Sequence, residues 1–437
     1  MIDLFGEAPA HWRTMRLRQT VTACSNGVWG GEPRCDASDI VCVRVSDFDR
    51  LRLRVDLRHP TLRSVAQVHR RGRMLARGDL LLEKSGGGEN QPVGAVVLYD
   101  ADTPAVCSNF IARMPMARGF EPRYLCYLHA ALFYLRVNCR SIHQTTGIQN
   151  LDSAAYLSEK VRIPDLAEQR EMAADLDRKT AWVDQVVENK EHLLELLKQK
   201  RHALISHAIA GGKGTPAHWP VTRLKFIRSG AFLYGANEPA VLEDRAAPRY
   251  IRITDLNDDG TLRDDTFQSL PEPLAARYLL QDGDILLARS GATVGKALRY
   301  RAEWGRACFA GYLVRLRPDR RKALPDYLYY YTQSQAFRHQ VSECAVQSTI
   351  PNVSAERYAN FSISLPPLEE QEAIVRFLDR RTRTLDSALR VVSRQLAKLR
   401  EYRRALIVTA VTREYRGVSA EGSGVAAGTA KDGAGSR

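Results

Sequence analysis

Hydrophobic residues recur at alternating spacings of three and four along two long stretches of the chain, the pattern of a helix with a narrow apolar seam. One stretch begins at Pro164 and the other at Pro366, and they align without a gap at an offset of 202 residues. The two copies share 16 identities in 48 positions. Because both keep one register for more than four heptads, the pattern predicts two long helices that pair as an antiparallel coiled coil. The apolar seam positions are Leu176, Val183, Val187, Leu194, Leu197, Leu204, Leu378, Leu385, Leu389, Val392, Leu396, Leu399 and Leu406.

The same periodicity would also suit two amphipathic helices that pack separately, each on its own domain core. Two observations favour pairing. The seam is narrow, and both copies place their apolar residues in the same register. Each stretch opens with a proline and acidic residues, which are typical of the first turn of a helix.

The repeat extends upstream of the helices into segments of mixed character. Their offsets vary between 202 and 208 residues, whereas the offset within the helices stays at 202. The chain is therefore a tandem duplication of a variable globular segment followed by a helix of constant length. The matching segments are Ala10–Leu17 with Ala217–Leu224, Arg44–Asp49 with Arg252–Asn257, Arg77–Gly87 with Asp282–Ala292, and Gln144–Leu151 with Gln347–Val353.

This organisation predicts an α+β protein with an internal pseudo-two-fold. Two tandem mixed α/β domains would be separated and joined by the coiled coil. The expected boundaries are 1–163 for the first domain, 164–211 for the first spacer helix, 212–365 for the second domain, 366–414 for the second spacer helix, and 415–437 for a tail that is expected to be disordered.

Composition limits the functional class. The chain has 437 residues and 44% hydrophobic residues, enough for two cores. It lacks an apolar run of membrane-spanning length and a leader at Met1, and its eight cysteines do not match between the copies. We therefore expect a cytoplasmic protein with reduced thiols and no membrane association. Most of the net charge of +14 lies on the globular segments, +6 on residues 1–163 and +5 on 212–365. A basic surplus on both segments suits a polyanion bound at two places.

Arginines form two candidate contact sites in the first domain. Arg50, Arg52 and Arg54 alternate with apolar residues, which predicts that they share one face of a strand. Arg70, Arg71 and Arg73 form a basic turn that could bind a phosphate. A solvated outer face would give the first pattern equally well.

Loops that follow a repeated strand provide further candidates. Residues 83–94 and 288–296 combine hydroxyls and cations with flexible glycines, as a loop that contacts nucleic acid would. A simple glycine hairpin is the alternative. The polar segment that precedes each long helix is repeated as well. The candidates are Lys84, Ser85, Arg289, Ser290, Thr293 and Lys296 in the loops, and Gln144, Thr145, Thr146, Gln347, Ser348 and Thr349 before the helices.

The sequence contains no convincing catalytic motif. Gly291–Lys296 is too short for a phosphate-binding Walker loop, and we find no amino-methyltransferase, nuclease, nucleophile-elbow or zinc-protease pattern. His11 and His218 recur beside tryptophans, where packing is the simpler role, and the aromatic clusters Tyr124–Tyr134 and Tyr327–Tyr331 have the spacing of core helices. A duplicated chain without a duplicated catalytic site is expected to bind rather than to catalyse.

These features together resemble the specificity (S) subunits of type I restriction–modification systems. The similar features are the two P-x-L-x-E-Q helices, the Ala-His-Trp segment at the start of each domain, the repeated Gly-Asp strand and loop, and the segment Gln347–Asn352. The first copy, Gln144–Asn150, departs from the pattern because it lacks the proline. The resemblance covers residues 10–413.

The resemblance implies a non-catalytic subunit that binds double-stranded DNA. Each domain would read one half of a split, asymmetric target, and the coiled coil would fix the gap between the halves. It also implies two methyltransferase (M) subunits and restriction (R) subunits as partners, with S-adenosylmethionine, ATP and Mg²⁺ bound by those partners and no cofactor in this chain. Two alternatives remain open. The chain could be a non-catalytic coiled-coil scaffold that joins two ligand-binding domains, or the specificity chain of a fused restriction–methylation enzyme.

Overall fold

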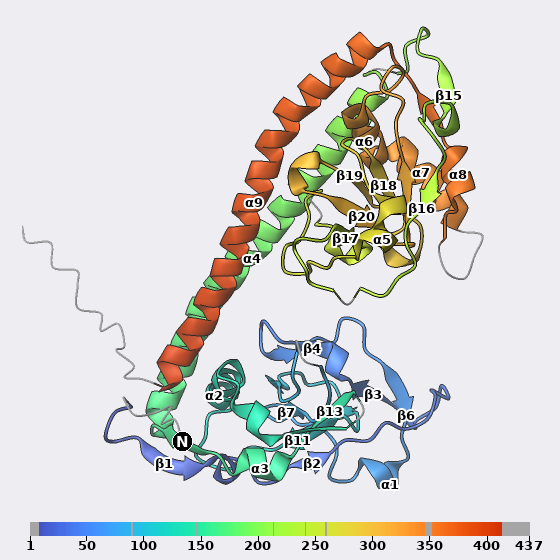
Figure 1. The fold of residues 1–437 in the computed structure, drawn as a ribbon. Helices are drawn as coiled ribbons and strands as arrows, with labels where there is room; N and C mark the ends of the chain where they lie inside the picture. Colours follow the sequence, from blue (N-terminus) through green and yellow to red (C-terminus); the bar gives the residue numbers. More distant parts are fainter. Residues whose placement is uncertain are drawn as a thin grey trace, which may run out of the picture. The chain divides into compact units, whose positions relative to one another are not determined.

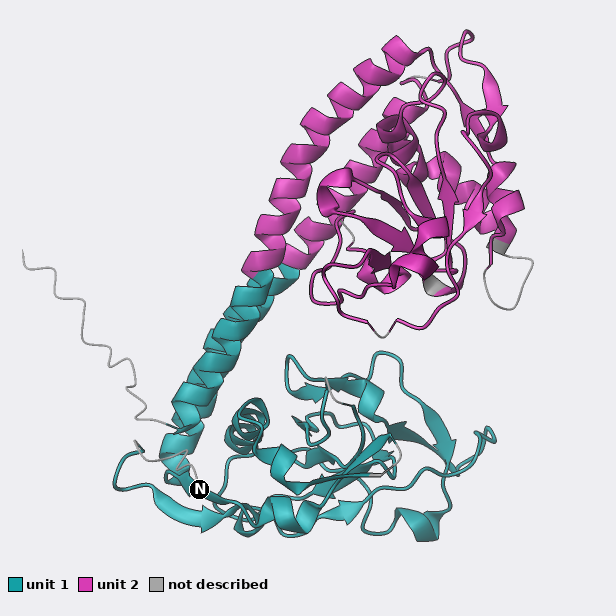
Figure 2. Cartoon of the chain, viewed as in Figure 1, with its two compact units in different colours: residues 1–189, 396–437 teal, residues 190–395 magenta. Residues whose placement is uncertain are grey.

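The computed structural model describes residues 8–88, 91–145, 147–212, 214–240, 242–257, 260–345 and 352–412. The tail predicted at 415–437 lies outside these residues. The chain divides into two compact units (Figure 2). Unit 1 comprises residues 1–189 and 396–437, and unit 2 comprises residues 190–395.

Both predicted long helices are present. Helix α4 spans Leu166–Ile209 and helix α9 spans Leu368–Thr412 (Figure 1). The start of α4 lies in unit 1 with the end of α9, and the end of α4 lies in unit 2 with the start of α9. The helices are therefore antiparallel, as the seam predicted. All the predicted seam positions are buried or half-buried. No helix in the described ranges is long and apolar enough to cross a membrane.

Two ion pairs fix how the helices face each other. In unit 1, Nε of Arg403 on α9 donates to Asp184 on α4 at 2.7 Å. In unit 2, Nε of Arg201 on α4 donates to Asp386 on α9 at 2.7 Å. Each residue of one pair lies 202 positions from its counterpart in the other pair, so the coiled coil has the same internal symmetry as the sequence.

Unit 1 is built on short strands in several sheets. In its described residues the largest sheet has the order β2-β11-β7-β9-β5-β4, and smaller sheets have the orders β10-β3-β6, β12-β13-β8 and β1-β14. Helix α2 contacts β9 of the large sheet. The strands are β1 (Arg13–Arg16), β2 (Ser25–Asn26), β3 (Asp39–Val43), β4 (Phe48–Asp49), β5 (Arg54–Val55), β6 (Leu62–Ser64), β7 (Leu80–Glu83), β8 (Ser85–Gly86), β9 (Val96–Leu98), β10 (Ala105–Cys107), β11 (Ile111–Met114), β12 (Ile142–Thr145), β13 (Ile148–Leu151) and β14 (Lys160–Ile163), and the helices are α1 (Gln67–Arg70), α2 (Pro122–Tyr134) and α3 (Ser153–Leu157).

Unit 2 repeats this topology. Its sheet β16-β21-β18-β19 has the strand order of β2-β11-β7-β9, and the parallel pair β17-β20 matches the parallel pair β3-β10. The antiparallel pair β15-β22 matches β1-β14. The elements are β15 (Val221–Arg223), β16 (Leu233–Tyr234), β17 (Arg249–Ile251), β18 (Ile285–Ala288), β19 (Ala297–Arg299), β20 (Ala307–Phe309), β21 (Leu313–Leu316), β22 (Ser362–Ser364), α5 (Glu272–Ala275), α6 (Pro325–Gln333), α7 (Gln335–Ala345) and α8 (Ala355–Ala359).

The central strand of each unit is buried on both faces. Leu80 and Leu82 of β7 belong to the core that includes α2 and the ends of the long helices, whereas Leu81 belongs to the core on the opposite face. Ile285 and Leu286 of β18 divide between two cores in the same way. This alternation follows from the two-residue period of a strand and explains the uninterrupted apolar runs in both copies.

The P-x-L-x-E-Q motif anchors each globular domain to its helix. Glu168 accepts hydrogen bonds from Trp12 Nε1 at 3.0 Å and from His11 Nε2 at 2.9 Å. Gln169 accepts a hydrogen bond from the backbone amide of Glu121, at the start of α2, at 2.9 Å. The Ala-His-Trp segment therefore attaches the domain to α4, with Trp12 buried in the core and the His11 side chain exposed.

Unit 2 has the same anchor. Glu370 accepts hydrogen bonds from Trp219 Nε1 at 2.9 Å and from His218 Nε2 at 2.8 Å, and these two bonds lower the pKa of its carboxyl group. Gln371 accepts from the amide of Leu324, before α6, at 2.8 Å. Both parts of the motif therefore point toward the attached domain.

Candidate nucleic-acid interface

The loop that follows β7 in unit 1 is held by two backbone hydrogen bonds. The amide of Lys84 donates to the carbonyl of Phe110 at 2.8 Å, and the amide of Leu151 donates to the carbonyl of Lys84 at 2.7 Å. These bonds bring together three segments that are distant in the sequence. Lys84 consequently lies between β11 and the strand β13 that precedes the first long helix.

Unit 2 repeats this backbone frame. The amide of Arg289 donates to the carbonyl of Tyr312 at 3.0 Å, and the amide of Val353 donates to the carbonyl of Arg289 at 2.8 Å. Arg289 and Lys84 are therefore structurally equivalent, although their surroundings differ in sequence. The prediction that the two loops occupy matching places is confirmed for the frame around these residues.

Lys84 and Arg289 contact equivalent residues of their units, but through different kinds of interaction. Nζ of Lys84 donates to the side-chain oxygen of Asn26 on β2 at 2.7 Å. The guanidinium of Arg289 lies over the ring of Tyr234 on β16, 4.6 Å from its centroid. An ammonium group suits an amide oxygen, whereas a planar guanidinium suits an aromatic face. Each unit therefore positions a positive charge at the same place.

Serine and asparagine complete the cluster in each unit. Ser85 Oγ donates to the side-chain oxygen of Asn150 at 2.6 Å. In unit 2, Ser290 forms a backbone bridge with Asn352. The segment Gln144–Asn150 is thus equivalent to Gln347–Asn352 at its asparagine, even though it lacks the proline.

Of the polar candidates that precede the long helices, only some can be placed. The side chain of Gln144 is exposed and accepts a hydrogen bond from Gln149 at 3.4 Å. Thr145 ends β12. Thr146 and the three candidates Gln347, Ser348 and Thr349 lie outside the described residues.

An exposed aromatic residue flanks each cluster, and the sequence motifs did not single it out. Phe110 is 46% exposed and Tyr312 is 65% exposed, and each lies directly before the strand that pairs with β7 or β18. In sequence, each aromatic directly precedes an apolar strand, but only the backbone bond to Lys84 or Arg289 places it beside the cation.

The remaining loop candidates in unit 2 have structural partners. Nζ of Lys296 donates to the carbonyl of Leu256 at 2.9 Å, which ties the loop to a neighbouring segment. Thr293 ends a short 3₁₀ helix, Gly291–Thr293, and is half-buried. A contact of either residue with a ligand stays a prediction.

The arginines Arg50, Arg52 and Arg54 do not share a strand, which corrects the expectation from their alternation. Strand β4 ends at Asp49 and strand β5 begins at Arg54. Residues 50–53 between them form a turn, in which Leu53 has a φ of +55°. The turn breaks the two-residue period of a strand, so the alternation does not place these arginines on one strand face.

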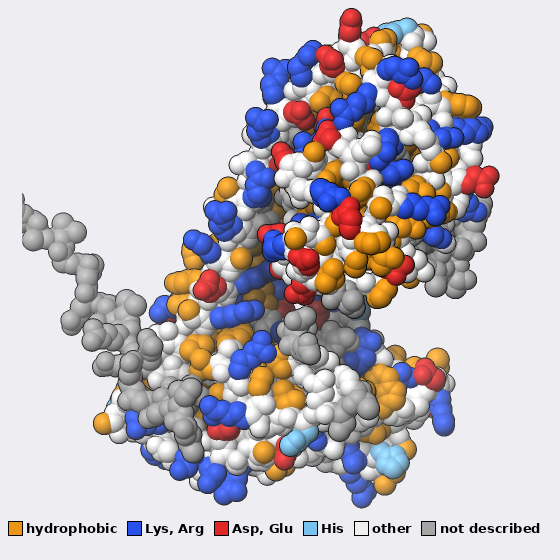
Figure 3. Space-filling model, viewed as in Figure 1, with side chains coloured by type: hydrophobic (Ala, Val, Ile, Leu, Met, Phe, Trp, Pro, Cys, Tyr) orange, Lys and Arg blue, Asp and Glu red, His pale blue; other side chains and the backbone are white. Residues whose placement is uncertain are grey.

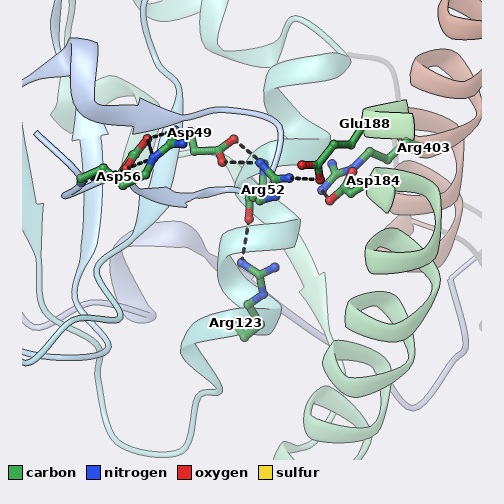
Figure 4. Close-up of polar contacts among 8 residues, drawn as sticks. Asp49, Arg52, Asp56, Arg123, Asp184, Glu188 and Arg403 are labelled. Carbon is green, nitrogen blue, oxygen red and sulfur yellow. Dashed lines mark hydrogen bonds and ion pairs between the residues drawn. The ribbon is translucent and has the colours of Figure 1, made fainter. Parts of the chain in front are cut away.

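Two of these arginines already have acidic partners within unit 1. Arg50 donates to Glu83 at 2.8 Å, and burial raises the pKa of the Glu83 carboxyl while Arg50 opposes that shift. Arg52 pairs with Asp49 at 3.3 Å and with Glu188 of α4 at 3.4 Å (Figure 4). Only Arg54 is exposed. Arg50 and Arg52 therefore stabilise unit 1, and their charges are largely neutralised there.

The basic turn at residues 70–73 is also mostly engaged. Arg70 donates to the carbonyls of Val65 and Ala37, and Arg73 donates to those of Asn26 and His69. These bonds brace the turn. Arg71, by contrast, is exposed and has no hydrogen-bond partner among the described residues. Because its side chain is exposed, Arg71 remains a candidate for contact with a phosphate.

Basic side chains are not gathered in one patch on the visible face. Lys and Arg are spread over each unit and along the helices, mixed with Asp and Glu (Figure 3). On this face the excess of positive charge therefore does not locate a binding site, and the equivalent clusters of the two units are better guides.

Comparisons with known proteins agree with this geometry. Residues 242–390 match the family model described as the type I restriction modification DNA specificity domain. The chain is 25% identical over 329 residues to the StySPI specificity subunit of Salmonella potsdam, covering 70% of this chain and 69% of that protein. The chain is similar to type I specificity subunits. The resemblance inferred from the sequence is thereby confirmed.

Other relatives extend the similarity. The EcoKI specificity subunit of Escherichia coli is 25% identical over 283 residues, or 62% of this chain and 61% of that protein. A solved chain from a study of complex assembly and conformational transition of the type I restriction–modification system has a TM-score of 0.63 at 21% identity. The similarity covers 93% of this chain and 98% of that chain, and it supports the fold. The family model matches a segment of the second half of the chain, whereas the structural similarity extends over both halves.

Proposed function

We propose that this chain is the DNA specificity subunit of a type I restriction–modification complex and that each unit reads one half of a split, asymmetric target. The observation that carries the proposal is the repetition of one backbone frame with different side chains on it. Asn26 in unit 1 and Tyr234 in unit 2, for example, occupy equivalent places beside the cations Lys84 and Arg289. Two domains of one architecture with different surfaces are suited to two different half-sites.

The long helices act as the spacer in this proposal. Helices of 44 and 45 residues are each roughly 66 Å long at 1.5 Å per residue. Their antiparallel pairing is held by two equivalent ion pairs, one in each unit. A rigid spacer converts protein length into a fixed number of base pairs, which a flexible linker cannot do.

The chain performs no chemistry of its own in this proposal. Two methyltransferase subunits and the restriction subunits bind to it, and they supply S-adenosylmethionine, ATP and Mg²⁺. The P-x-L-x-E-Q residues face the attached domains, which leaves the outer faces of the helices for these partners. The complex acts in the cytoplasm, where the host DNA is.

The test is to map methylated adenines in host DNA by single-molecule sequencing, with and without this chain co-expressed beside its genomic neighbours. The expected result is a split, asymmetric motif that disappears when the chain is deleted. Replacing residues 1–163 by the corresponding segment of a relative should change one half of that motif only. A change in both halves would refute independent reading.

The same experiment addresses the alternatives. If no methylated motif depends on the chain and the purified complex lacks salt-sensitive DNA binding, a scaffold that joins two other ligands becomes the better account. If a motif depends on the chain but the co-purified partner is a single polypeptide with methylation and restriction domains, the chain serves a fused enzyme.

A further inference from the structure

The two units retain a positive charge at one position while changing the side chain against which it rests. Lys84 is fixed by a hydrogen bond to Asn26, and Arg289 is fixed by stacking on Tyr234. A lysine ammonium is a compact point charge, whereas the arginine guanidinium is a planar fork of donors, so the two groups present different hydrogen-bonding geometries. What the units share is therefore charge, and charge is what a phosphate requires.

Hydrogen-bonding groups around this charge are shared as well. Ser85 and Asn150 lie beside Lys84, and Ser290 and Asn352 lie beside Arg289. Because Ser85 donates to the oxygen of Asn150, the amide nitrogen of Asn150 remains a donor. Serine hydroxyls and asparagine amides are common phosphate ligands in protein–DNA complexes.

A glycine follows the serine in both units and leaves the surface open. Gly86 has a φ of +119° and Gly291 a φ of +75°, conformations that L side chains rarely adopt. Apart from the glycine itself and its two chain neighbours, no atom of the described residues lies within 4 Å of the position that a Cβ would occupy at Gly86 or Gly291. A ligand can therefore approach the backbone closely beside each cation.

The cluster is equivalent in the two units, and this equivalence indicates which part of the DNA its residues contact. If the two units read different half-sites, as the proposed function states, residues that are the same in both cannot distinguish the halves. Contacts to phosphates fix orientation and carry no sequence information, so they are the contacts that both units can share.

We infer that Lys84, Ser85 and Asn150 in unit 1, and Arg289, Ser290 and Asn352 in unit 2, each form a clamp that binds the DNA phosphodiester backbone independently of sequence. This inference rests on the proposed function and adds the ligand of the cluster, a phosphate group. Residues that differ at the edge of the clamp, such as Asn26 and Tyr234, remain available to distinguish the half-sites.

The experiment measures binding of the full chain, assembled with its methyltransferase partner, to a duplex with the methylated motif and to a scrambled duplex, over a range of salt concentrations. Lys84→Ala and Arg289→Ala should each weaken binding to both duplexes by the same factor, roughly tenfold for one charge-assisted hydrogen bond. Each should also reduce the slope of log affinity against log salt by about one. The methylated motif should stay unchanged.

Matched variants separate charge at the clamp from other effects. Lys84→Arg and Arg289→Lys keep the charge and should keep affinity and motif. Lys84→Gln and Arg289→Gln remove the charge with less change in size, and they replace the alanine variants if those fail to fold. Arg118→Ala and Arg301→Ala remove exposed charges elsewhere in the same units and should have smaller effects.

Three results would contradict the inference that the cluster binds phosphate. They are a changed methylated motif in an Arg289 variant, unchanged DNA affinity in both alanine variants, or equal losses of DNA affinity in the two control variants. Absence of salt-sensitive DNA binding by the wild-type complex would instead overturn the proposed function, so the two failures are distinguishable.

Discussion

Asp184 and Asp386 occupy equivalent positions on the two long helices, and each accepts a hydrogen bond from the arginine of the opposite helix at 2.7 Å. Their surroundings differ. The Arg403 side chain in the first pair is 2% exposed, whereas the Arg201 side chain in the second pair is 16% exposed. Nη1 of Arg403 is buried without a partner among the described residues.

This difference predicts unequal costs for the two aspartates. Asp184→Ala leaves a buried, uncompensated arginine and should lower the free energy of unfolding by about 3–5 kcal/mol. Asp386→Ala leaves a more exposed arginine and should cost clearly less. Urea unfolding followed by far-UV circular dichroism measures both. Replacing Asp184 and Arg403 together by leucine should regain most of the loss, and a double variant no better than Asp184→Ala would contradict the argument.

Two glycines are expected to be irreplaceable for a packing reason. A Cβ on Gly27 would lie 2.0 Å from the carbonyl oxygen of Cys107, and one on Gly235 would lie 2.2 Å from that of Phe309. Because backbone atoms cannot move aside easily, Gly27→Ala should cost about 1–3 kcal/mol or more in unfolding free energy. Gly31→Ala has open space and should change stability by less than about 0.5 kcal/mol. Similar midpoints for the two variants would refute this prediction.

Acid should weaken unit 1 through His129. This side chain is fully buried against the hydroxyl of Tyr156, and burial lowers its pKa from 6.5 to about 4. Below pH 6.5 the unfolded chain takes up a proton that the folded chain does not, so stability falls as the pH drops from 6.5 toward 4. Between pH 7 and pH 5 the expected loss is about 2 kcal/mol.

The variant His129→Gln isolates this contribution because it cannot titrate. Its unfolding free energy should depend less on pH between 7 and 5 than that of the wild type, whatever its absolute stability. Parallel pH profiles for the two proteins would show that His129 does not control the acid sensitivity.

A proline in the coiled coil should separate folding of the domains from assembly. Leu389→Pro removes a helix hydrogen bond and costs about 3 kcal/mol or more, which should break α9 within the seam. The variant should no longer form a complex with methyltransferase subunits, while most of its secondary structure persists. Size-exclusion chromatography measures the complex formation. Leu389→Ala is the control for lost seam packing alone. An intact complex with the proline variant would count against the spacer role.

The long helices were predictable from sequence because their periodicity is local and sustained. The sheets were not, since their strands are short and pair with partners far along the chain, as Arg13 does with Ile163. The turn at Leu53 shows the limit most clearly. Arginines that alternate with apolar residues imitate a strand, and only tertiary packing around a buried leucine with a positive φ reveals the turn.

The candidate interface was predicted in part for a similar reason. Repetition of the loop pointed to Lys84 and its equivalent Arg289, each with the serine that follows it. The places of Asn26 and Phe110 could not be found that way, because both approach the loop only through sheet pairing. Arg50 and Arg52 were attractive by charge, yet acidic partners of both lie far along the chain.

The anchor at each helix start has an evolutionary consequence. Glu168 and Gln169 bind the first and the central parts of one globular domain, and Glu370 and Gln371 do the same for the other. Each joint is complete within its own unit. A genetic crossover at the codons for Pro164 or Pro366 would therefore transplant a whole domain with its attachment already matched. Under the function proposed above, a host would gain a new half-site in one step without rebuilding the rest of the chain.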